Sequence, residues 1–194
     1  MSEMMIQKNP LMEACQQLSR QVLRRSYADK SFAPMMRRNV GKTINTANAN
    51  VLLAFYGVFD KYVESDDIVK KRFSDLIQDD KAFFVMCLQC LWRPEDYKNS
   101  IRLEKVVGSL PQKKESLKKH FYSILNLSWD EDGFLAGKIY HFVRMCWNEG
   151  IVIDCASLLY DLLEWEKQDK YNGSYVKKRW ARDFMHMYSI KSDE

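Results

Sequence analysis

Apolar residues recur at steps of three and four along nearly the whole chain, and this spacing is the strongest constraint on its fold. Leu11, Cys15, Leu18 and Val22, for example, fall on one side of a helix. The chain has only seven glycines and four prolines but ten methionines, a balance typical of helices with adaptable cores. We therefore expect an all-α fold.

Capping and turn residues divide the chain into successive helices. Thr46 can cap one helix, Ser128 and Glu131 match a capping box for a long helix, and Asp154 can cap the helix that follows Gly150. The helices that we expect cover residues 11–27, 32–40, 47–63, 68–78, 82–92, 100–110, 115–126, 128–148 and 155–165, and a last one begins at residue 174.

A polar stretch at residues 93–100 contains Pro94 and is the expected division between domains. The chain of 194 residues is long enough for two small bundles, and 46% apolar residues can fill their interiors. We expect two short helical bundles in series, an N-terminal one at 1–97 and a C-terminal one at 98–194.

No apolar stretch suggests a membrane segment or a secretory signal. The longest apolar run covers residues 82–88, well short of the roughly 18 residues that a membrane span needs. Residues 1–10 lack the basic start and apolar block of a signal peptide. Five scattered cysteines fit buried thiols in a reducing compartment better than disulfides. We expect a cytoplasmic protein with no membrane partner.

Charge is segregated along the chain far more than the net charge of +4 suggests. Residues 17–42 hold seven basic residues and one acidic residue, residues 98–120 seven and two, and residues 167–182 six and one. Residues 121–166 hold eight acidic residues against two basic ones. Such clusters create strong local fields, although each could also be an ordinary solvated helix face.

Residues 175–187 form the most informative of these basic segments. At about 100° per residue, Val176, Trp180 and Phe184 share one stripe with Met187, while Lys178 and Arg182 lie nearly opposite them. Lys177 and Arg179 lie on the flanks. We expect the aromatic side to anchor the helix, and the basic side to neutralise the phosphates of a nucleic acid.

Two sets of residues leave room for a different chemistry. Cys87 and Cys90 have the spacing of half a zinc site or a thiol redox motif, but they stand in an apolar helical stretch without a second pair. Asp154 and Asp161 are seven residues apart and could pair for acid–base or metal chemistry, although Asp154 is better used as a helix cap. The three histidines lie on separate predicted helices, outside any catalytic motif. We expect no catalysis, metal or cofactor, with a thiol or metal enzyme as the least favoured alternative.

Three blocks resemble the C-terminal half of the CasB family, the small subunit of the type I-E CRISPR Cascade complex. They are Gly-Ile-Val-Ile-Asp at 150–154, Leu-Leu-Tyr-Asp-Leu-Leu-Glu-Trp at 158–165 and Val-Lys-Lys-Arg-Trp-Ala-Arg-Asp-Phe at 176–184. Near the N-terminus, Met-Met-Arg-Arg-Asn-Val-Gly-Lys at 35–42 is similar to a basic stretch of that family. Cys155 stands where the family commonly has tryptophan.

The resemblance implies a helical, non-catalytic subunit that pairs with a second copy of itself among other Cascade subunits. Its basic surface would steady the duplex of guide RNA and target DNA and hold the displaced strand, so that the R-loop persists. Matching of the family's motifs implicates two groups of cations in nucleic-acid binding: Arg37, Arg38, Lys42, and Lys177, Lys178, Arg179, Arg182. Charge alone adds three more: Arg102, Lys118 and Lys119. The main alternative is a helical adaptor that docks acidic proteins.

Overall fold

The protein is all-α, as expected from its apolar spacing. The computed structural model describes residues 9–64, 71–109, 115–129, 133–168 and 173–190. In these residues β-structure is confined to isolated bridges. The α-helices are α1 (Pro10–Ala28), α2 (Phe32–Arg37), α3 (Ala49–Phe59), α4 (Asp79–Gln89), α5 (Glu115–Leu125), α6 (Phe134–Asn148), α7 (Cys155–Leu163) and α8 (Tyr175–Ile190). Short 3₁₀ helices join them: η1 (Ile44–Thr46), η2 (Phe73–Asp75), η3 (Pro94–Asn99) and η4 (Leu103–Ser109).

Local sequence explains how several helices begin and end. The side chain of Asn9 accepts hydrogen bonds from the backbone at the start of α1. The prediction that Asp154 caps α7 is confirmed, because its carboxylate accepts from the Ser157 amide at 3.1 Å. Gly150, just beyond α6, has a φ of 71°, a left-handed conformation that glycine adopts without steric cost.

Two predicted helix starts are wrong. Asn48 rather than Thr46 caps α3, since the Asn48 side chain accepts from the Val51 amide, whereas the Thr46 hydroxyl donates to the preceding turn. α6 begins at Phe134 and not at residue 128. Trp129 is held outside the helix, because its amide donates to Glu166 and its indole to Asp80.

Two predicted α-helices are not formed in the described residues. In the range 68–78, residues 71–78 carry only η2, because the backbone around Arg72 pairs with the backbone around Tyr62 as an antiparallel bridge. In the range 100–110, Ile101 pairs with Ile153 and the chain then forms the 3₁₀ helix η4. In both places, backbone groups outside the predicted helix take hydrogen bonds that the helix would need.

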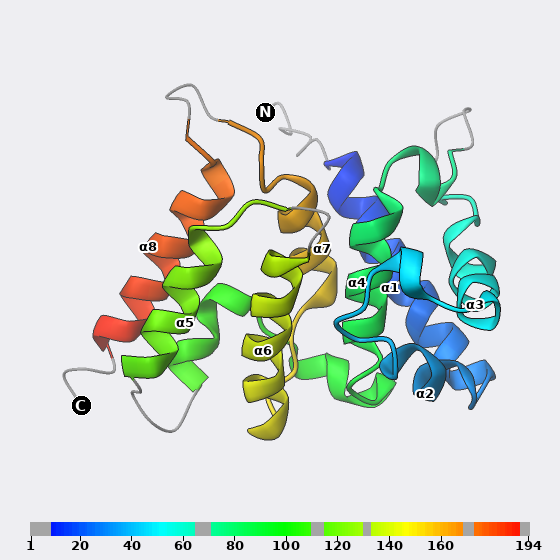
Figure 1. Ribbon diagram of the computed structural model, residues 1–194, viewed down its shortest axis with the longest axis horizontal. Coiled ribbons are helices and arrows are strands. Elements are labelled where there is room, and N and C mark those ends of the chain that lie inside the picture. Colours follow the sequence, from blue (N-terminus) through cyan, green and yellow to red (C-terminus); the bar gives the residue numbers. More distant parts are fainter. Residues whose placement is uncertain (1–8, 65–70, 110–114, 130–132, 169–172, 191–194) are drawn as a thin grey trace, which may run out of the picture.

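α7 lies between the two ends of the molecule, with α5, α6 and α8 on one side and α1 to α4 on the other (Figure 1). It packs against α1 and α4, so the buried residues from Ala14 to Phe184 form one cluster. The division into bundles at 1–97 and 98–194 therefore stays a prediction. None of the helices in the described residues has the length and apolar character that a membrane crossing requires.

Candidate nucleic-acid interface

α8 has the two sides that its sequence predicts. Val176, Trp180 and Phe184 are buried, and the ring of Phe121 on α5 stacks on Phe184 with centroids 4.0 Å apart. Phe121 also stacks on Trp180 at 5.9 Å. These contacts hold α8 against α5 and turn the opposite side of α8 to the solvent. Lys178 lies exposed on that side.

Two of the predicted binding arginines belong to a buried ion cluster beneath α8. Arg102 approaches Glu104 at 2.7 Å and Asp161 at 3.1 Å, and Arg179 pairs with the same Asp161 carboxylate. The Trp180 indole donates a hydrogen bond to Asp161 at 2.8 Å. Both carboxylates are only 1% exposed. The cluster joins η4, α7 and α8 and balances two positive charges with two negative ones.

The cluster changes the role of its arginines. Burial raises the pKa of the Glu104 carboxyl, and the nearby guanidinium groups of Arg102 and Arg179 oppose that rise. Removing either arginine would leave buried negative charge without its partner, which is strongly destabilising. The geometry therefore assigns Arg102 and Arg179 to the stability of the fold, since both pair with buried carboxylates and their side chains are 31% and 13% exposed.

Lys177 is also engaged within the protein. Its ammonium donates a hydrogen bond to the Leu127 carbonyl oxygen at 2.7 Å and lies 5.3 Å from the centre of the Trp165 ring. The contact ties α8 to the segment that follows α5. Of the four cations in the basic block of α8, Lys178 and Arg182 are thus the two that are exposed.

α5 extends the exposed face of α8. The Tyr122 hydroxyl donates to the Met185 sulfur at 3.3 Å, and the ammonium of Lys118 lies 5.7 Å from the centre of the Tyr122 ring. Lys118 is half-buried and Lys119 is exposed. The contact with Met185, three residues beyond Arg182, places these lysines on the same side of the protein as the α8 cations.

α6 adds two exposed cations that the charge pattern of the sequence did not single out, Lys138 and Arg144. They were hidden by the strongly acidic count for residues 121–166, although no acidic residue occurs between Phe134 and Asn148. The acidic residues flank α6 in the sequence. Counting charge helix by helix, rather than over a long segment, would have found them.

The three helices form what we call the α5–α6–α8 surface, with α5 between α8 and α6 (Figure 1). Asp183 is the one acidic residue among the side chains described on these helices. The chain's three histidines are exposed there, one on each helix: His120, His141 and His186. The exposed lysines and arginines are Lys119, Lys138, Arg144, Lys178 and Arg182, with Lys118 half-buried.

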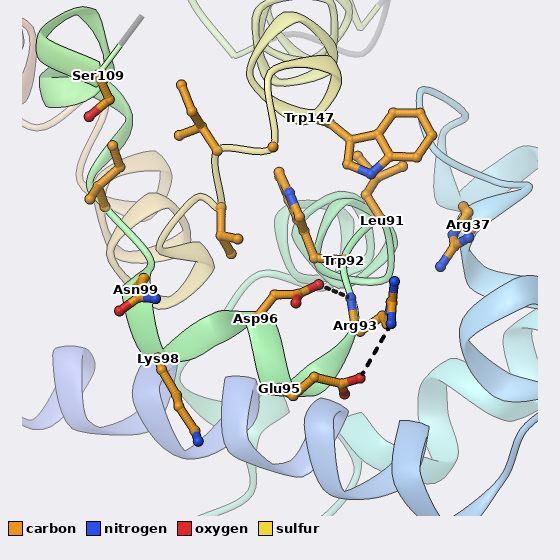
Figure 2. A pocket seen from close by; sticks show the side chains of 14 residues that line it. Arg37, Leu91, Trp92, Arg93, Glu95, Asp96, Lys98, Asn99, Ser109 and Trp147 are labelled. Carbon is orange, nitrogen blue, oxygen red and sulfur yellow. Dashed lines mark hydrogen bonds and ion pairs between the residues drawn. The ribbon is translucent and has the colours of Figure 1, made fainter.

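The three N-terminal cations lie elsewhere. Arg37 and Arg38 are exposed at the end of α2, which lies at the opposite end of the long axis from α8 (Figure 1). Lys42 is exposed in the loop after α2, where it lines a pocket with Trp129 and with Ala136 of α6. The structure therefore does not bring the two predicted groups together. Arg37 lines a groove whose walls also include Arg93 and Trp147, two residues that sequence reasoning missed (Figure 2).

The residues considered for thiol, metal or acid–base chemistry take part in the packing and capping of the fold. Cys87 and Cys90 are buried in and just after α4, and burial raises the pKa of the Cys90 thiol to about 12. Asp154 caps α7, and Asp161 lies in the ion cluster. Among the described residues, no three His, Cys, Asp or Glu side chains are grouped so that they could hold a metal ion. These positions do not form an open reactive site.

Comparison of the chain with protein-family models, with curated proteins and with solved structures finds no match.

Proposed function

We propose that the protein is a non-catalytic subunit that binds the sugar-phosphate backbone of nucleic acid through the α5–α6–α8 surface. The observation that carries the proposal is the division of α8 into a buried aromatic side and an exposed side with Lys178 and Arg182. α5 and α6 add further cations, and Asp183 on α8 is the single acidic residue among the described side chains of the three helices. A rigid surface of this kind can neutralise several phosphates without reading bases.

The resemblance to the CasB family supports a more specific proposal, a cytoplasmic Cascade small subunit. In that setting its partners are guide RNA, target DNA, other Cascade subunits and a second copy of the chain. Replacing a DNA duplex by an RNA–DNA duplex is nearly balanced in free energy, so backbone contacts of this surface would suffice to prolong the R-loop. Base pairing would supply the sequence specificity.

The salt dependence of binding tests whether the exposed cations contact phosphates. Each neutralised phosphate contributes about 0.7–0.9 to the slope of log affinity against log salt. If Lys178 and Arg182 each contact one phosphate, replacing both by glutamine lowers that slope by roughly 1.4–1.8. Lys138→Gln with Arg144→Gln tests in the same way whether the interface includes α6.

The matched control is Lys61→Gln with Lys71→Gln, which removes two exposed positive charges outside the α5–α6–α8 surface. It should lower the slope by less than the α8 variant does. Equal slopes for the two double variants would show only a general charge effect and would contradict the proposed surface.

The Cascade assignment has its own test. Added to the other subunits of a type I-E complex, the protein should lengthen the lifetime of the R-loop, and the α8 double variant should not. A partner protein that stays bound after nuclease treatment, with no measurable oligonucleotide binding by the chain, would support the adaptor alternative instead.

A further inference from the structure

A groove of about 720 Å³ lies between the end of α2, the end of α6 and the segment that follows α4 (Figure 2). Its walls come from α2, from the segment that leads out of α4 into η3, from the end of α6 and from the loop at residues 150–152. None of the cations on the α5–α6–α8 surface lines it. Trp147 of the groove lies on α6, three residues from Arg144, so the groove borders that surface without using its cations.

An exposed tryptophan stands at one wall of the groove. Trp147 is near the end of α6 and is 40% exposed, whereas Trp92, Trp165 and Trp180 are at most 6% exposed. The groove is therefore bordered by a large, flat aromatic side chain that is open to solvent. An exposed ring of this kind can stack on the face of a nucleic-acid base.

Two arginines, Arg37 and Arg93, line the same groove and lie lower than the Trp147 ring in the view of Figure 2. The Nε of Arg37 donates to the Cys90 carbonyl oxygen at 2.8 Å, which holds this guanidinium at the wall. Arg93 is 80% exposed in its side chain. A guanidinium held in place in advance loses little entropy when it binds a phosphate.

Both carboxylates of the groove contact Arg93. Asp96 accepts a hydrogen bond from the Arg93 amide at 3.1 Å, and Glu95 lies 4.0 Å from the Arg93 guanidinium. The remaining lysine, Lys98, points away toward α1 (Figure 2). Arg93 is thus partly paired with Glu95, whereas Arg37 forms no ion pair within the described residues and keeps its charge for an anion in the groove.

Trp92 gives a second sign that the groove is incomplete without a ligand. Its side chain lines the groove and is only 6% exposed, and its indole nitrogen has no hydrogen-bond partner among the described residues. A buried donor of this kind has a free-energy cost that an oxygen of a bound molecule would relieve.

We propose that this groove binds a single-stranded nucleic acid, with one base stacked on Trp147 and the adjoining phosphates on Arg37 and Arg93. A base inside a duplex has both faces covered, so only an unpaired nucleotide can use the tryptophan. The inference rests on the proposed function and divides it: the α5–α6–α8 surface binds any backbone, and the groove selects an unpaired strand.

The test compares two oligomers of equal length by fluorescence anisotropy, oligothymidylate and an abasic sugar-phosphate chain. Trp147→Ala should weaken binding of oligothymidylate roughly tenfold and leave binding of the abasic chain unchanged. Trp147→Phe keeps an aromatic ring and should retain most of the affinity. Phe134→Ala, which removes an aromatic side chain 61% exposed at the far end of α6, should have no effect.

The outcomes separate the two proposals. If the wild-type protein binds oligothymidylate but Trp147→Ala binds it equally well, the groove proposal is overturned and the backbone-binding surface stands. If the wild-type protein binds neither oligomer, both proposals fail. If Trp147→Ala instead loses only self-association or a protein partner, the groove is a protein-docking site and the proposal is likewise wrong. Circular dichroism of each variant confirms that it folds.

Discussion

Arg179 and Arg182 stand three residues apart on α8, yet the same substitution should affect the protein in opposite ways. The Arg179 side chain is 13% exposed and pairs with the buried Asp161 carboxylate. The Arg182 side chain is 75% exposed, and its partner Asp183 lies 3.5 Å away. We predict that Arg179→Ala lowers stability and spares the binding surface, whereas Arg182→Ala weakens binding and spares stability.

The magnitudes follow from burial. Removing one partner of a buried ion pair costs about 3–5 kcal/mol. Arg102 still lies beside both carboxylates after Arg179→Ala, so we expect the lower end, about 3 kcal/mol. For a domain of this size, that loss lowers Tm by roughly 6–12 °C. Arg182→Ala should change the free energy of unfolding by less than about 0.5 kcal/mol, since exposed pairs contribute little.

Thermal unfolding followed by circular dichroism measures the first effect, and oligonucleotide anisotropy at about 0.1 M salt, below the Tm of both variants, measures the second. Arg182→Ala should reduce the salt slope by about 0.7–0.9, and folded Arg179→Ala should leave it close to that of the wild type. A Tm for Arg179→Ala within about 2 °C of the wild type would refute the argument from burial. A larger loss of binding for Arg179→Ala than for Arg182→Ala would refute the assignment of Arg179 to stability and of Arg182 to binding.

Three further predictions concern the fold. Phe184→Ala removes a fully buried ring stacked on its α5 neighbour and should cost about 3–5 kcal/mol in a urea titration, whereas an effect below about 1 kcal/mol would contradict the packing. Asp154→Ala removes the cap of α7 and should cost about 1 kcal/mol, and Asp154→Ser should recover most of it. Burial raises the pKa of Cys15 and Cys90 to about 12, so both thiols stay protonated at about pH 8. They should react with a disulfide reagent only after denaturant is added. Rapid labelling of Cys87 or Cys90 in the native protein would instead support the alternative of a thiol enzyme.

Much of α8 was predictable from the sequence. A helix of known pitch fixes which residues share a side, so the spacing of Val176, Trp180 and Phe184 is sufficient to assign them to the core. The exposed positions of Lys178 and Arg182 followed from the same geometry. The engagement of Lys177 did not follow, because its carbonyl partner belongs to Leu127, fifty residues earlier in the chain.

Helix boundaries were less predictable where distant segments meet. The apolar spacing of residues 100–110 is compatible with an α-helix, but the pairing of Ile101 with Ile153 takes its first backbone groups. The candidate site shows the same limit. Trp147 and Arg37 are 110 positions apart in the sequence, and nothing local to either residue indicates that they line one groove.

The sequence alone determined that the chain is helical, where most helices lie, and which side of its last helix is apolar, because each of these depends on neighbours within a few residues. Only the tertiary structure decided which cations are available for binding. Arg179 and Arg182 carry the same charge on the same helix, and they differ because η4 and α7 bring Glu104 and Asp161 to one of them. Charge is a property of a residue, whereas its availability depends on the partners that folding places beside it.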